Sequence, residues 1–339
     1  MRFFVPLLFV AALTAQPATR TRVFASLSKD ALEASETTGV IRVIAGVTAT
    51  LNEKDKTITV TGPVDQMALA EWLFQALDGP VRQRPVPKPG QKLLVREYRA
   101  SADDIVHVIY LPELGSLQHV QEVVTAARSV SGVLDFYTST RQEAVITRGR
   151  PGDLALADWI CTELTAASAQ PAPQSVSMSE YAVAVKADHG VKGDAFVRVY
   201  TLPNFEWPYG LQEVITTVRS LAYLAHLYVD ATGRAVTARG NREQLALADW
   251  LFRELDRAAS QPEPHRVESR QYKTGDELVR LFFLMRNVTP EQVEELALRI
   301  RTSTQMTTIF TVNSLRAIAM RGTPEQIAEA GRLIAATGD

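Results

Sequence analysis

The sequence predicts an α+β fold in which small βαββα modules, each with two helices on a three-stranded sheet, follow one another in tandem. Three observations carry this prediction: a stretch of seventeen residues that occurs twice, a strand–helix–hairpin–helix pattern around it, and proline-rich segments between the copies. The repeated stretch reads AVITRGRPGDLALADWI from Ala144 and AVTARGNREQLALADWL from Ala235. Such similarity without gaps indicates internal duplication.

Alignment on the glycine that ends the second hairpin strand reveals four copies. These glycines are Gly62, Gly149, Gly240 and Gly322. The tenth residue after each is Trp72, Trp159, Trp250 and, in the last copy, Arg332. The eleventh is Leu73, Ile160, Leu251 and Leu333. We expect the glycine to let the strand turn into the helix where a side chain would obstruct, and the Trp and Leu side chains to fill the space between layers. The first copy is in register only in its second half.

The third copy justifies each element in order. Residues 197–202 alternate and are rich in β-branched and aromatic residues, which predicts a strand. From Leu211, apolar residues at three- and four-residue spacing predict one helix face. Residues 226–230 and 234–240 flank a turn and predict a hairpin, and residues 242–255 predict the second helix. In the last copy Thr323 is the expected N-cap, with Pro324 at the first helical position and Gln326 three residues after the cap.

Proline-rich segments separate the copies at residues 79–92, 166–177 and 258–266. Proline favours extended, semi-rigid spacers, so the predicted arrangement is a row of separate modules and not a tightly stacked solenoid. A stretch after each linker is expected to form an extra edge strand or a lead-in. The predicted boundaries are a degenerate repeat 1 at 20–79, repeat 2 at 93–166, repeat 3 at 180–258 and repeat 4 at 267–338.

Composition and the N-terminus indicate an exported globular protein. Of 339 residues, 46% are hydrophobic, which does not favour disorder, and 36 basic against 38 acidic side chains give no field that attracts nucleic acid. Residues 1–15 have a single cation, Arg2, and a short apolar run, which predicts a signal peptide cleaved near Ala15. The alternative is a buried N-terminal strand. No later segment is apolar enough to span a membrane, so we expect a periplasmic or secreted protein.

The sequence predicts no catalytic residue, no cofactor and no metal site. Cys161 is the single cysteine, which excludes an intrachain disulfide and predicts a small buried apolar residue. None of the five histidines recurs in register, so a metal site is not expected. The GRPG motif of residues 149–152 resembles the GXXG loop of KH domains, but it lies between a strand and a helix instead of two helices. We therefore do not expect nucleic acid as a partner.

Two groups of residues are candidate interfaces. Arg148, Arg239 and Arg321 recur just before the anchor glycine, either as solvated residues at a strand end or as a repeated contact with the next module or a partner. The loop PNFEWPYG holds Phe205, Trp207 and Tyr209. These aromatic side chains form either an exposed partner contact or a locally packed cluster.

The segment from Thr307 to Ala336 resembles the short periplasmic N-domains of secretins, the outer-membrane ring channels of type II and type III secretion and of type IV pili. The residues that carry the resemblance are Asn313 in the hairpin and the Gly-Thr-Pro-Glu turn that begins at Gly322. The other copies have Thr140 and Ala231 at the asparagine position, so they join the resemblance through the repeat. No barrel region follows the fourth copy. The resemblance implies ring building and protein contacts without catalysis.

The sequence therefore predicts a non-enzymatic assembly or adaptor protein in the cell envelope, which binds a protein partner or itself. One alternative is an envelope protein that binds a ligand such as a glycan through the aromatic loop around Trp207. An enzyme is the third possibility considered, and no residue pattern favours it.

Overall fold

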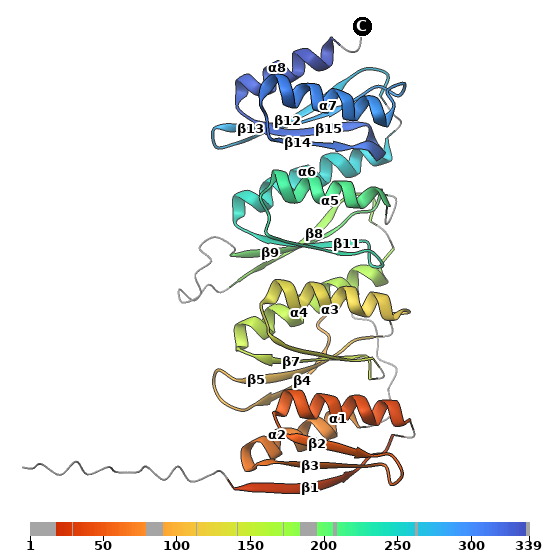
Figure 1. Cartoon of the computed structure of the whole chain (residues 1–339), viewed down its shortest axis with the longest axis vertical. Coiled ribbons are helices and arrows are strands. Elements are labelled where there is room, and N and C mark those ends of the chain that lie inside the picture. The colour runs from red at the N-terminus through yellow and green to blue at the C-terminus, as the bar shows by residue number, and fades with distance from the viewer. Residues whose placement is uncertain are drawn as a thin grey trace, which may run out of the picture. The chain divides into compact units, whose positions relative to one another are not determined.

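A computed structural model describes residues 18–28, 30–78, 91–112, 114–140, 142–171, 173–183, 195–205, 209–261 and 264–336. In these residues eight α-helices and four small antiparallel sheets are found, which confirms the α+β prediction (Figure 1). The predicted signal peptide lies outside the described residues. Contacts divide the chain into two compact units, Met1–Val81 and Arg82–Asp339.

The first unit contains module 1, and its element order is the predicted βαββα. The elements are β1 (Thr19–Ala25), α1 (Ala31–Ala45), β2 (Thr48–Asn52), β3 (Thr57–Pro63) and α2 (Val64–Leu77). The three strands pair antiparallel in the order β1-β3-β2. Alternate residues of β3, including Ile58 and Val60, are fully buried beneath the two helices.

The second unit contains modules 2, 3 and 4, and each sheet there has four strands instead of the predicted three. Module 2 comprises β4 (Leu94–Arg99), β5 (Ile105–Tyr110), α3 (Leu117–Ser131), β6 (Asp135–Ser139), β7 (Ala144–Gly149) and α4 (Pro151–Ala169). Module 3 comprises β8 (Ser177–Ala182), β9 (Phe196–Thr201), α5 (Tyr209–Leu221), β10 (His226–Asp230), β11 (Ala235–Gly240) and α6 (Arg242–Ser260). Module 4 comprises β12 (Glu268–Thr274), β13 (Glu277–Phe283), α7 (Pro290–Thr304), β14 (Thr308–Val312), β15 (Ala317–Gly322) and α8 (Pro324–Ala335).

The added strand comes from the stretch after each linker. Strands β4, β8 and β12 each pair antiparallel with the next strand in the chain and form one edge of the sheet. They alternate exposed and half-buried residues, as an edge strand with one covered face does. Helices α4 and α6 continue to Ala169 and Ser260, so part of the second and third predicted linkers is helical. These segments therefore have little length left to act as spacers.

Modules 2, 3 and 4 are stacked, and the predicted row of separate modules is wrong for this unit. Helices α3 and α4 pack on the sheet of module 3, and α5 and α6 pack on the sheet of module 4 (Figure 1). Val197, Val199 and Ala235 of module 3 belong to the same apolar cluster as the helices of module 2. The sheets of modules 3 and 4 are thus buried on both faces, by their own helices and by those of the preceding module. Apolar and small residues on the second face make this burial favourable.

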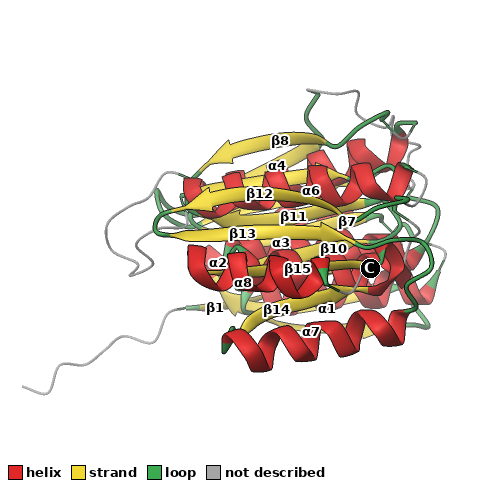
Figure 2. Cartoon of the chain, turned by 90° about the horizontal axis from the view of Figure 1, so that it is seen from above, coloured by secondary structure: helices red, strands yellow, loops and turns green. Residues whose placement is uncertain are grey.

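Helix starts follow the predicted signals. Thr323 Oγ1 accepts the Gln326 N–H at 3.3 Å, and the Gln326 side chain accepts the Thr323 N–H at 3.0 Å. Asn241 forms the same capping box with Gln244 at the start of α6. Figure 2 shows α7 and α8 together on one face of the last sheet. The described helices include none with the length and apolarity that crossing a bilayer requires.

At three of the four anchor glycines a side chain would obstruct, as the sequence predicted. None of the four has a positive φ, so the lack of a Cβ atom matters there and not a left-handed backbone. A Cβ atom at Gly62 would lie 2.6 Å from Val47 Cγ1, and one at Gly240 would lie 2.9 Å from Leu224 Cδ2. At Gly322 it would lie 2.7 Å from Gln326 Oε1. At Gly149 the nearest atom is 3.8 Å away, so this copy has room for a methyl group.

Three of the four aligned leucine-type positions are interior. Leu73, Ile160 and Leu251 are fully buried. Leu333 is half-buried, and the next residue, Ile334, is buried in its place. Trp72, Trp159 and Trp250 are half-buried, so the tryptophans lie at the margin of the cores.

Candidate functional site

Two of the three recurring arginines, Arg239 and Arg321, lie at the joints between stacked modules. Arg239 Nη1 donates to the carbonyl of Val130 at the end of α3, at 2.7 Å. Arg321 Nη1 donates to the carbonyl of Leu221 at the end of α5, also at 2.7 Å. A helix C-terminus has unpaired carbonyls and a partial negative charge, which a guanidinium complements. The contact is with the preceding module, whereas the sequence suggested the next one.

Arg148 makes a contact within its own module. Its Nη2 and Nε atoms lie 2.6 and 2.8 Å from the two carboxylate oxygens of Asp104. This hydrogen-bonded pair holds the pKa of Asp104 below its usual range. Arg321 has a similar pairing, with Glu277 at 2.7 Å, and its guanidinium also lies 4.2 Å from the ring centroid of Tyr223.

A glutamate recurs at the opposite end of each joint, and the sequence analysis missed it. Glu122 Oε2 accepts the backbone N–H of Thr232 at 3.0 Å. Glu213 Oε2 accepts both the backbone N–H and the hydroxyl of Ser314, each at 3.1 Å. Both acceptors lie in the first helix of one module, and both donors lie in the hairpin turn of the next. Glu122 and Glu213 stand at the same distance before their anchor glycines, which is the signal that could have identified them.

A tryptophan–tyrosine contact completes the repeated joint. Trp159 of α4 and Tyr181 of β8 have ring centroids 5.3 Å apart. Trp250 of α6 and Tyr272 of β12 repeat this contact at 5.4 Å. The repeated tryptophan therefore packs on the next module's edge strand, which extends the role expected within a single module.

The joint between modules 2 and 3 also contains a buried ionisable pair. His119 Nε2 lies 3.2 Å from Asp230 Oδ2, with side chains 2% and 0% exposed. Burial disfavours protonation of His119, but the Asp230 carboxylate and the Leu114 carbonyl outweigh it and raise the histidine pKa. Burial raises the pKa of Asp230, although His119 and the Gly233 N–H oppose this. The equivalent positions of the next joint hold Gly210 and Val312, so only the first of these two joints contains the pair.

A second histidine lies between two carboxylates inside module 2. His107 Nδ1 lies 2.9 Å from Asp158, and Nε2 lies 3.3 Å from Glu97. Module 3 has Arg198 at this position, and it pairs with Glu180 at 2.6 Å. The cluster thus occupies a place that another module uses for a structural ion pair. Across the described residues, no group of three or more metal-binding side chains is arranged to hold an ion.

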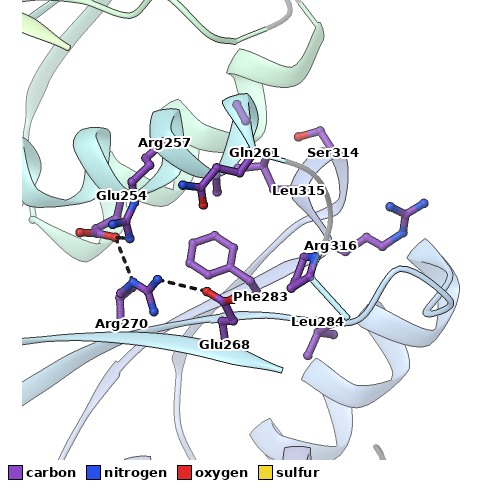
Figure 3. A pocket seen from close by; sticks show the side chains of 13 residues that line it. Glu254, Arg257, Gln261, Glu268, Arg270, Phe283, Leu284, Ser314, Leu315 and Arg316 are labelled. Atoms are coloured by element: carbon purple, nitrogen blue, oxygen red, sulfur yellow. Dashed lines mark hydrogen bonds and ion pairs between the residues drawn. The ribbon is translucent and has the colours of Figure 1, made fainter. Parts of the chain in front are cut away.

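A cleft of about 230 Å³ opens at the joint between modules 3 and 4. Figure 3 shows the ring of Phe283 directed into it from β13, beneath the end of α6. Arg270 lies between Glu254 and Glu268, at 3.5 and 3.1 Å. Arg257 and Arg316 also line the cleft, so three arginines face two glutamates, and the small net charge presents no strong field to a ligand.

The aromatic loop is only partly described. Phe205 is 5% exposed and packs in the core of module 3, so it belongs to a packed cluster and not to an exposed partner contact. The Asp256 carboxylate fixes the loop by accepting the Asn204 N–H at 3.0 Å and its side-chain amide at 2.7 Å. Trp207 and the side chain of Tyr209 lie outside the described residues.

Comparisons with known proteins give no family assignment. No protein-family model matches the chain, and no curated protein does. ExeD from Aeromonas hydrophila matches at 11% identity and TM-score 0.16, over 70% of this chain and 42% of that one. XcpQN012 matches at 12% and 0.20, over 73% and 99% of the two chains. Aspartate kinase from Synechocystis matches at 9% and 0.18, over 95% and 55%.

The first two of these structures contain secretin N-terminal domains, the class that the sequence resembles. All three TM-scores are far below 0.5, so the likeness carries no argument about family or activity. The chain spans less than half of the length of ExeD.

Proposed function

We propose that the chain is an exported, non-enzymatic assembly or adaptor protein, built from secretin-N-like modules, that binds a protein partner or itself in the cell envelope. One observation carries the proposal: most residues that recur from module to module form contacts between neighbouring modules of the chain. Glu122 and Glu213 bind hairpin turns, Arg239 and Arg321 bind helix ends, and the tryptophans pack on edge strands. Each module can thus bind the helices of one neighbour on its sheet and the sheet of another neighbour on its helices.

The outer edges of the sheets offer surfaces for a further protein. Strands β4 and β8 are edge strands, and among the described residues no strand pairs with their outer side. Leu94 on β4 and Met178 on β8 are 61% and 43% exposed, so each of these edges also presents an apolar side chain. An extended segment of a partner can add to such an edge through backbone hydrogen bonds.

Cross-linking in the envelope tests the proposal. A photo-reactive amino acid at Leu94 or Met178 is expected to capture one defined partner or a second copy, whereas the same group at Glu53, in the exposed hairpin of module 1, captures none. Light scattering on the purified protein gives its oligomeric state independently. A strict monomer with no cross-linked product at either strand would contradict the proposal. Removal of residues 1–15 is expected to retain the protein in the cytoplasm, which tests export separately.

The glycan-binding alternative gains no support from the described residues, because Phe205 is a core residue and cannot contribute to an exposed aromatic platform.

A further inference from the structure

The helix face of module 4 has a cavity of about 270 Å³. It lies between the loop that follows β13 and the helices α7 and α8, which cover one face of the last sheet (Figures 1 and 2). Its lining includes the apolar side chains Leu284, Val288, Leu296 and Ile334 and the polar side chains Asn287, Gln292, Glu295 and Arg299. A concave site lined by both apolar and polar side chains can receive a side chain of a partner.

The sister modules carry a large apolar side chain at the corresponding loop position. Phe205 occupies this position in module 3 and packs on the core. Leu114 occupies it in module 2 and packs on that module's core. Module 4 has the exposed polar residue Asn287 there, and Asn287 lines the cavity. The cavity therefore adjoins a position at which module 4 lacks the apolar side chain of the other two modules.

The rim of the cavity holds the joint glutamate. Glu295 stands at the same distance before Gly322 as Glu213 stands before Gly240. The equivalent carboxylates of modules 2 and 3 accept hydrogen bonds from a hairpin turn, and Glu295 is exposed on α7. Thus module 4 combines an acceptor for a turn with a space for an apolar side chain.

The joint between modules 3 and 4 shows which kind of turn fits this combination. There Ser314 gives its N–H and its hydroxyl to Glu213, and the next residue, Leu315, packs on the apolar cluster that contains Phe205. Phe205, Ser314 and Leu315 line one shared cavity. A hydroxyl residue followed by a large apolar residue therefore satisfies the carboxylate and covers the apolar surface together.

We propose that the helix face of module 4 binds a hairpin turn of a partner protein, in which a serine or threonine precedes a large apolar residue. The N–H and hydroxyl of the first residue donate to Glu295, and the apolar side chain enters the cavity beside Leu296 and Ile334. This inference deepens the proposed function and rests on it, because it names one surface and the kind of partner that fits it.

A peptide tests the proposal on the full chain. The probe is a fluorescent, disulfide-closed hairpin that carries the tip sequence VNSLRA of residues 312–317, and binding is measured by fluorescence anisotropy up to millimolar peptide. We expect Glu295→Ala to weaken binding about tenfold, because the turn loses two hydrogen bonds to a charged acceptor. Asn287→Phe is expected to leave binding largely intact, because module 3 carries Phe205 at this position and still receives the turn of Ser314 and Leu315.

Controls separate the proposed site from nonspecific adhesion. Glu329→Ala removes a carboxylate from α8, where it pairs with Arg332, and is expected to change the affinity less than twofold. A peptide with alanine for serine and leucine is expected not to bind. The circular dichroism spectrum and melting temperature of each variant check that module 4 remains folded.

Two outcomes would overturn the proposal: no binding at millimolar peptide, or binding that Glu295→Ala does not weaken. Either outcome would leave a partner cross-linked at the sheet edges standing, so the two proposals fail separately.

Discussion

Replacing His119 by alanine is expected to destabilise the second unit, because it leaves Asp230 buried at the joint without its partner. Both side chains are essentially inaccessible, and breaking a buried pair from one side costs about 3–5 kcal/mol. Asp230 keeps the Gly233 N–H at 2.8 Å, and its burial shifts its pKa upwards, which lessens the cost of the unpaired carboxylate, so we place the loss near the lower limit, at about 3 kcal/mol. For a unit of this size that corresponds to a fall of roughly 6–12 °C in melting temperature.

The joint between modules 3 and 4 indicates a second substitution that should restore stability. Because it holds Gly210 and Val312 at these two positions, the double variant His119→Ala, Asp230→Val removes both ionisable groups and restores an apolar contact. It is expected to recover most of the lost stability, since apolar replacement of a buried pair is often neutral or stabilising. Thermal unfolding followed by circular dichroism measures all three proteins. A double variant as unstable as His119→Ala, or a single variant within about 1 kcal/mol of wild type, would refute the reasoning.

The same pair predicts how stability depends on pH. The pKa of His119 is raised above 6.5, so its contribution is complete below that pH and is lost as pH rises through the folded-state pKa. The pKa of Asp230 is also raised, from 3.8, so this carboxyl likewise makes the folded state less stable as pH rises, but from a lower pH. Glu122 opposes them, because its pKa is lowered and its contribution is lost on acidification. Between pH 6 and pH 9 wild type should lose melting temperature relative to the double variant, and parallel profiles would count against the pair.

Four further outcomes are expected. Trp250→Ala should cost about 2–3 kcal/mol in thermal unfolding, below the loss for a fully buried ring, and an unchanged melting temperature would place the ring outside the joint. Arg239→Ala should cost about 1.5–3 kcal/mol, because a charged hydrogen bond to a helix end is lost, and Arg239→Lys should recover part of it. Gly152→Ala should stabilise by about 0.4–1 kcal/mol, because no atom lies within 4 Å of the new methyl group, whereas Gly62→Ala should destabilise. Cys161 should resist thiol reagents until the protein unfolds, because burial strongly raises its pKa, and rapid labelling of native protein would disprove this.

The periodicity of the sequence predicted most of the local structure, because local structure depends on neighbouring residues. The strand of residues 197–202, the hairpin after it and the capping box at Thr323 are found where the pattern placed them. The edge strands were left open between strand and lead-in, since their outward residues are polar and only one face is covered.

The stacking could not be read from the same pattern. Ala235 and Thr237 face away from the helices of their own module, and small residues there suit either solvent or another layer. Both are fully buried in the structure. The sequence analysis treated proline-rich segments as spacers, but the helices before them run on and shorten them. His119 and Asp230 are far apart in the chain, and no rule of spacing pairs them.

Each joint has a donor side and a receiver side that differ, so the array has a direction. A helix layer always meets a sheet layer, and the two contacts use matching positions. Excision of residues 173–263 would remove module 3. Trp159 would then lie opposite Tyr272 in place of Tyr181, and Glu122 opposite Ser314 in place of Thr232. Length can therefore change in whole steps during evolution while each boundary keeps its glutamate–turn and tryptophan–tyrosine contacts, although His119 would then face Val312 instead of Asp230.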